Sequence, residues 1–98
     1  MLSAEQVRED LKEIRYYYAM KHVFDAASKT VSADSLLNKV ARYNSVIKNA
    51  PARFYILYVS LYVQNTNQSE LAEAWGFTRE YIKELNGKLV EYLQTTVF

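Results

Sequence analysis

Hydrophobic positions recur at helical spacing over the first part of the chain. Apolar side chains return every three or four residues, at Val7, Leu11, Ile14 and Tyr18. Charged side chains occupy the other face, at Glu5, Arg8, Glu9, Lys12 and Glu13. Ser3 suits the N-cap position, because its hydroxyl oxygen can accept a hydrogen bond from an unpaired N–H of the first turn. We therefore expect a helix over residues 3–28, with one buried stripe and one solvated, charged face.

Two more helices are expected in the middle of the chain. Polar residues interrupt the first pattern at residues 28–32, and a new apolar stripe predicts a helix over residues 33–49 with Ser32 as its N-cap. Pro51 suits the first turn of the next helix, since the N–H that it lacks would be unpaired there. This third helix, over residues 51–63, is expected to bury Phe54, Leu57, Tyr58 and Leu61. Its β-branched and aromatic content leaves a strand as the alternative, but the proline and the neighbouring helices favour a helix.

The last third of the chain has the organisation of a helix-turn-helix. Asn67 and Glu70 have capping-box spacing and predict the start of a short helix. Gly76 is expected to end it, because a left-handed backbone costs glycine least. Thr78 would then cap a long helix over residues 79–94. Two helices joined by a short turn with glycine are typical of the helix-turn-helix, and an ordinary helical hairpin is the alternative.

The side chains of this segment can be divided into an inner and an outer set. Ala72 is small enough for a close crossing of the two helices, and Ile82 and Leu85 would anchor the second helix. Three further side chains are expected to face the core, those of Leu71, Trp75 and Phe77. The outer set of the second helix would then consist of Arg79, Glu80, Lys83, Glu84, Asn86 and Gly87.

Exposed residues at the start of the second helix of such a unit enter the major groove of DNA. Arg79 could bind guanine with two hydrogen bonds, and Glu80 or Glu84 could accept one from cytosine N4. Phosphates suit the lysines and the polar residues near helix starts. The candidate DNA-binding residues are therefore Gln68, Thr78, Arg79, Glu80, Lys83, Glu84, Asn86 and Lys88. For Lys83 and Glu84, ordinary surface charge is an equal alternative.

Composition supports an all-α fold of about five helices. The 98 residues include only 2 Gly and 1 Pro, fewer turn residues than a sheet-rich domain of this size usually needs. We expect an N-terminal helical pair over residues 1–50 and a helix-turn-helix unit over residues 51–98, together in one compact domain. With no Cys and one His, neither a disulfide framework nor a metal site is expected, and no cofactor. No apolar run suggests a membrane span, so we expect a cytoplasmic protein.

The charge balance complicates DNA binding. The net charge of the chain is +1, and residues 51–98 carry four basic and five acidic residues. An acidic recognition unit should bind DNA weakly at physiological salt, because neutralised phosphates supply much of the affinity of a DNA-binding protein. Useful affinity would then require a homodimer, which doubles the contacts, or RNA polymerase as a co-binder.

The second half of the chain resembles the fourth region of bacterial sigma factors. The resemblance rests on the Pro-started helix PARFYILYVSLYV, a polar loop, and the opening NQSELAEAWGFT. The whole chain resembles small phage-encoded late-gene activators of Gram-positive bacteria, of the ArpU and RinA kind, through IRYYYAMKHVFD, ARYNSVIKNAPARFY and REYIKELNGKLVEYLQ. This resemblance implies promoter binding beside host RNA polymerase and activation of packaging and structural genes.

A protein-binding module is the alternative function, namely a helix-turn-helix that no longer reads DNA and binds polymerase, a partner regulator or a host defence protein instead. The near-neutral charge and the 9 tyrosines favour it, since tyrosine is enriched at interfaces. Residues 16–18 are all tyrosine and cannot all face one core, so Tyr16 is expected at the surface, either for a partner or as a core-edge residue. An enzyme is not expected, because the chain has no nucleophile–base set and no phosphate loop. His22 is interpreted as an edge residue.

Overall fold

The computed structural model describes residues 2–21 and 31–97, the side chains of residues 31–34 excepted. The described residues form helices and no strand, which confirms the all-α prediction. In chain order the elements are α1 (Ala4–Ala19), α3 (Val31–Ile47), α4 (Ala52–Tyr58), the π-helical segment η1 (Val59–Val63), α5 (Gln68–Trp75) and α6 (Arg79–Thr96). None of the described helices combines the length and the apolar character needed to cross a membrane.

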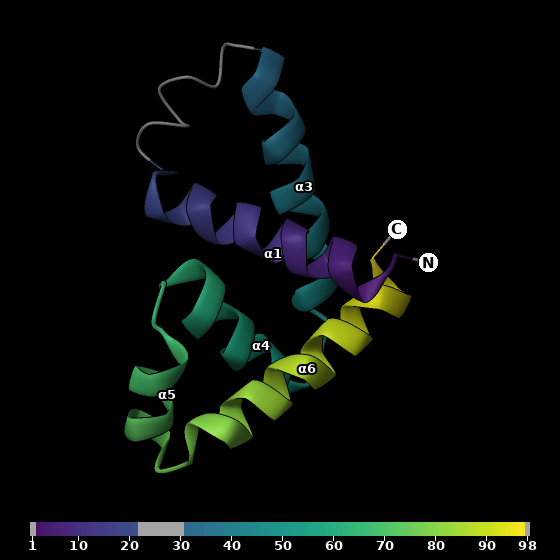
Figure 1. Cartoon of the computed structure of the whole chain (residues 1–98). Coiled ribbons are helices and arrows are strands. Elements are labelled where there is room, and N and C mark those ends of the chain that lie inside the picture. Colours follow the sequence, from purple (N-terminus) through teal and green to yellow (C-terminus); the bar gives the residue numbers. More distant parts are fainter. Residues whose placement is uncertain (1, 22–30, 98) are drawn as a thin grey trace.

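Helix α1 lies in the middle of the arrangement (Figure 1). It packs against α3 on one side and against η1 and α6 on the other. The start of α1 and the end of α6 lie side by side, and the Gln94 Nε2 atom donates to the Leu2 carbonyl at 3.3 Å. The α5–α6 turn lies at the far end of the molecule from α3 (Figure 1).

One hydrophobic core joins all these elements. The inner face predicted for residues 51–63 is buried as expected, and so are three of the four positions of the first stripe. Tyr18 is half-buried, and Tyr16 is 57 % exposed, as predicted from the three-tyrosine run. The least exposed core side chains are those of Val7, Ile14, Tyr43, Leu57, Ile82, Leu89, Leu93 and Val97.

Two predicted helix boundaries are wrong. The first helix ends at Ala19, because Met20 has left the helical region with φ −116° and ψ 26°. Periodicity alone missed this break, since apolar residues continue past it without glycine or proline. Residues 22–28 of the predicted helix, His22 among them, lie outside the described residues. The next helix begins at Val31, so Ser32 lies within it and is not its N-cap.

The helix after Pro51 changes its hydrogen-bonding pattern halfway. The Pro51 carbonyl accepts from the N–H groups of Phe54 and Tyr55 at 2.9 and 3.1 Å, which opens α4 in a helical turn and excludes the strand alternative. Over Val59–Val63 the helix widens to π geometry, and Gln64 N donates to Val59 O at 2.8 Å. The sequence did not predict this widening. Short π segments are rare within α-helices and often occur at functional sites.

Candidate nucleic-acid interface

Helix α5, the first helix of the predicted helix-turn-helix, begins at the predicted capping box. The Asn67 side chain accepts from Glu70 N at 2.8 Å, and the Glu70 carboxylate accepts from Asn67 N at 3.3 Å. Both bonds lie within four residues of sequence, which explains why the sequence predicts them. Gln68 and Ser69 lie in the same first turn, where N–H groups have no partner within the helix.

The turn also has the predicted geometry. Gly76 is left-handed, with φ 73°, and Phe77 N donates to Ala72 O at 2.9 Å, closing the end of α5. The Thr78 side chain then accepts from Tyr81 N at 3.1 Å and caps α6. Gly76, Phe77 and Thr78 thus join α5 to α6 through the short, glycine-containing turn that the helix-turn-helix prediction requires.

One of the three side chains expected to face the core does not. Leu71 is buried and Trp75 is half-buried, but Phe77 is 51 % exposed. The turn extends beyond the edge of the core, so the Phe77 ring packs instead on the ring of Tyr81, with centroids 4.7 Å apart. Tyr81 is itself 42 % exposed, so these two rings form an aromatic patch on the surface.

Most of the candidate DNA-binding side chains are on the surface, as predicted. Six are exposed and Gln68 is half-buried; the six are Thr78, Arg79, Glu80, Lys83, Glu84 and Lys88. Asn86 was expected to point outward and does not, since it is 8 % exposed. Asn86 follows Arg79 by seven residues, or about two helical turns, and lies at the edge of the buried stripe of α6. There its Oδ1 atom accepts a hydrogen bond from the Tyr62 hydroxyl at 2.6 Å.

A basic cleft lies between one face of α1 and the starts of α5 and α6. It consists of three adjoining hollows that have lining residues in common, two of about 440 Å³ and one of about 210 Å³. Glu80 is the one acid among the residues that line it. The cations that give the basic cleft its name are Arg8, Lys12, Arg15, Arg79 and Lys83.

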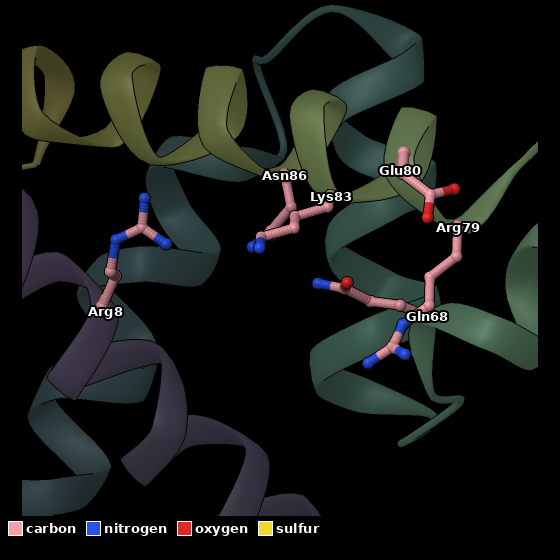
Figure 2. A pocket seen from close by; sticks show the side chains of 6 residues that line it. All are labelled: Arg8, Gln68, Arg79, Glu80, Lys83 and Asn86. Atoms are coloured by element: carbon pink, nitrogen blue, oxygen red, sulfur yellow. The ribbon is translucent and has the colours of Figure 1, made fainter.

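Figure 2 shows how the two walls face each other. Arg8 extends from α1 on one side of the cleft, Lys83 and Asn86 extend side by side from α6 on the other, and Gln68 is directed into it from α5. Five of the eight candidate DNA-binding residues therefore line one surface, namely Gln68, Arg79, Glu80, Lys83 and Asn86. The other three, Thr78, Glu84 and Lys88, do not line it.

The sequence did not identify the α1 wall as part of a site. Arg8, Lys12 and Arg15 follow one another at intervals of four and three residues, which places them in one row along the helix. This spacing was a usable signal. We interpreted the charges of this helix as an ordinary solvated face, because the sequence does not show that α6 lies opposite.

The cations of the basic cleft are weakly neutralised by the protein itself. Lys12 Nζ lies 3.4 Å from Glu9 Oε1, but both side chains are well exposed, and such surface pairs contribute little. Arg8, Arg79 and Lys83 form no ion pair with any residue of the described ranges 2–21 and 31–97. Their charges are therefore available to an anionic ligand.

Arg15 is held at the end of the cleft by the loop before α5. Its Nε donates to Asn65 Oδ1 at 3.1 Å, and Asn65 Nδ2 donates back to the Arg15 carbonyl at 3.4 Å. Asn65 has a positive φ of 60°, a conformation that asparagine tolerates better than most residues. The loop thus keeps Arg15 beside Asn67, Gln68 and Ser69 at the start of α5.

A buried polar network fixes the other side of α1. Asp10 is 2 % exposed, and its carboxylate accepts from the Tyr43 hydroxyl at 2.5 Å and from Gln6 Nε2 at 2.8 Å. Lys39 Nζ lies 3.1 Å from the same carboxylate and 2.8 Å from that of Glu13. The network joins α1 to α3 and limits rotation of α1 about its axis, which keeps the cation row turned towards α6.

Comparison with protein families, with curated proteins and with solved structures finds no match for this chain.

Proposed function

We propose that this protein binds double-stranded DNA sequence-selectively through α6 and regulates transcription. The observation that supports this most is the exposed start of α6, directly after a capped turn, bordering a basic cleft. The start of the second helix of such a unit is the part that reaches base edges in the major groove.

The exposed residues of α6 have the chemistry needed to read bases. Arg79 can donate two hydrogen bonds to the O6 and N7 atoms of guanine. Glu80 and Glu84 can each accept from the N4 amino group of cytosine. Lys83 lies between these positions on the cleft side and suits a phosphate. Asn86 is excluded from this set, because it is buried against Tyr62.

The resemblance to phage late-gene activators extends the proposal to a biological role. It adds host RNA polymerase as a co-binder at the promoter, and it places the protein in the cytoplasm of the host cell. A co-binder or a homodimer would also strengthen binding by a unit that carries more acidic than basic residues.

The proposal can be tested by selecting ligands for the full chain from a pool of random-sequence duplexes. We expect enrichment of one sequence, and loss of that selectivity in the double variant Arg79→Ala/Lys83→Ala. Its helical content and Tm should stay near those of the wild type, since both side chains are exposed. The matched control Arg42→Ala/Lys48→Ala also removes two exposed cations, outside the cleft, and should retain selectivity. A folded wild type that enriches no sequence would refute sequence-selective binding.

A protein-binding module is a second candidate, favoured by the aromatic patch of Phe77 and Tyr81. These rings are 51 % and 42 % exposed, and aromatic side chains are typical binding residues of protein interfaces. The two functions predict different effects of Phe77→Ser/Tyr81→Ser. DNA selection should survive this change if α6 reads bases through Arg79 and Lys83, whereas binding of a protein partner at the turn should be lost.

A further inference from the structure

We infer that α1 supplies phosphate contacts for the DNA bound by α6, so that the DNA-binding surface is shared between the two ends of the chain. This inference rests on the proposed function and deepens it. It addresses the charge problem, since residues 51–98 alone carry a net charge of −1. The fold places three cations from residues 1–50 opposite the two cations at the start of α6.

The position of the α1 cations suits a polyanion that follows the cleft. A separation of seven residues along a helix corresponds to about 10 Å, from a rise of 1.5 Å per residue. This is close to the rise of about three base pairs, at 3.4 Å per phosphate along each strand. The row from Arg8 to Arg15 is therefore long enough to contact more than one phosphate of one strand.

The end of the cleft at α5 adds a second type of phosphate ligand. Arg15 and Arg79 lie on either side of the first turn of α5, where Gln68 and Ser69 line the same hollow. Unpaired N–H groups at a helix start attract phosphate. The guanidinium of Arg15 is already positioned there by Asn65, so less side-chain entropy is lost when a phosphate binds.

Tyr62 and Asn86 form the floor between the two walls. Burial raises the pKa of Tyr62, so its hydroxyl stays protonated at neutral pH and donates to Asn86. This floor carries no charge that would repel a phosphate. Glu80 is the one acidic residue of the lining and stands at the α6 side, where the bases rather than the backbone would lie.

The test measures how binding of the full chain to labelled DNA duplexes depends on salt. The probes are the selected duplex and a random-sequence duplex pool, titrated by fluorescence anisotropy between about 50 and 200 mM salt. Each lost phosphate contact lowers the slope of log K against log salt by about one. We therefore expect a slope shallower by about two for Arg8→Gln/Arg15→Gln, with affinity falling equally for both probes.

Two further variants make the result specific. Arg8→Gln alone removes a side chain that has no ion pair or hydrogen bond within the described part of the chain, and should lower the slope by about one. Arg42→Gln/Lys48→Gln changes the net charge as much as the double variant does, outside the cleft, and should leave the slope unchanged.

The outcomes separate this inference from the function on which it rests. If the wild type binds DNA and Arg8→Gln/Arg15→Gln has the slope of the wild type, the role of α1 is refuted while DNA binding by α6 stands. If the folded wild type binds neither probe even at low salt, both proposals are refuted. A slope reduced only by the cleft variants supports the inference.

Discussion

The carboxyl group of Asp10 illustrates what one residue contributes to this fold. It is buried, but its hydrogen bonds to Gln6 and Tyr43 and its ion pair with Lys39 compensate for the lost hydration. Burial, and next the bond to Asp10, raise the pKa of Tyr43, so the hydroxyl stays a donor. The bond to Glu13 is the largest influence raising the pKa of Lys39, and burial opposes it, so the amine stays charged.

This network could not be predicted from the sequence. Aspartate is usually exposed, and the hydrophobic pattern of the first helix assigns positions by apolar residues alone. Asp10 becomes recognisable as a buried residue only when Tyr43 and Lys39, about thirty positions later, are known to lie opposite. By contrast, the exposure of Tyr16 was predictable, because three consecutive helical residues span too wide an arc for one core.

We predict that Asp10→Ala destabilises the protein by about 1–3 kcal/mol, the usual cost of leaving a buried polar group unsatisfied. The Tyr43 hydroxyl would lose its acceptor in a site with no exposure. Urea unfolding at neutral pH measures the change, with Glu9→Ala, an exposed acid of the same helix, as control. Equal stability of both variants would mean that the network contributes nothing to the fold.

At the scale of elements, local chemistry determined what was predictable. The capping box at Asn67, the left-handed Gly76 and the Thr78 cap all depend on neighbours within four residues, and all three predictions are confirmed. The break at Met20 and the π-helical segment η1 have no such local signal. The widened turn of η1 coincides with the bond between Tyr62 and Asn86, a contact with another helix.

The two glycines of the chain should respond oppositely to alanine. Gly76→Ala should destabilise by about 1–2 kcal/mol, because φ is 73° there and a left-handed backbone costs other residues about that much. Gly87→Ala should stabilise by about 0.5–1 kcal/mol, since Gly87 lies inside α6 and glycine is a poor helix former. A Cβ would meet no atom within 4 Å at either position, so thermal unfolding compares backbone effects alone. Shifts of the same sign would contradict the assigned turn.

At the scale of the whole molecule, the basic cleft arises from packing rather than from any one segment. Its α6 wall was predicted from the spacing of Arg79 and Lys83. Its α1 wall could not be predicted in the same way, because the core and the Asp10 network determine which side of α1 faces α6. Sequence reasoning therefore found about half of the candidate surface, the half that belongs to a recognisable local unit.

We expect the chain to unfold as one unit, because α1 and α6 share a core. Ile14 has no exposure, and Ile14→Ala should cost about 2–5 kcal/mol. Trp75, the one tryptophan of the chain, reports on α5 by fluorescence, while circular dichroism reports on all helices. Both probes should shift to lower urea by the same amount, and the exposed control Lys12→Ala should leave both in place. If the unfolding transition measured by tryptophan fluorescence did not shift in Ile14→Ala, the chain would consist of two units that unfold independently.

The gathering of cations on one side of a nearly neutral chain has a kinetic consequence. Five cations and one acid line the cleft, so positive charge is concentrated there although the chain as a whole is nearly neutral. Such a molecule has a local positive surface but almost no net attraction to a distant polyanion. Its field turns the cleft towards a duplex at close approach, within about 8 Å at physiological ionic strength. Arbitrary DNA would hold it only briefly, so its search for a target should proceed by repeated free diffusion rather than by long sliding.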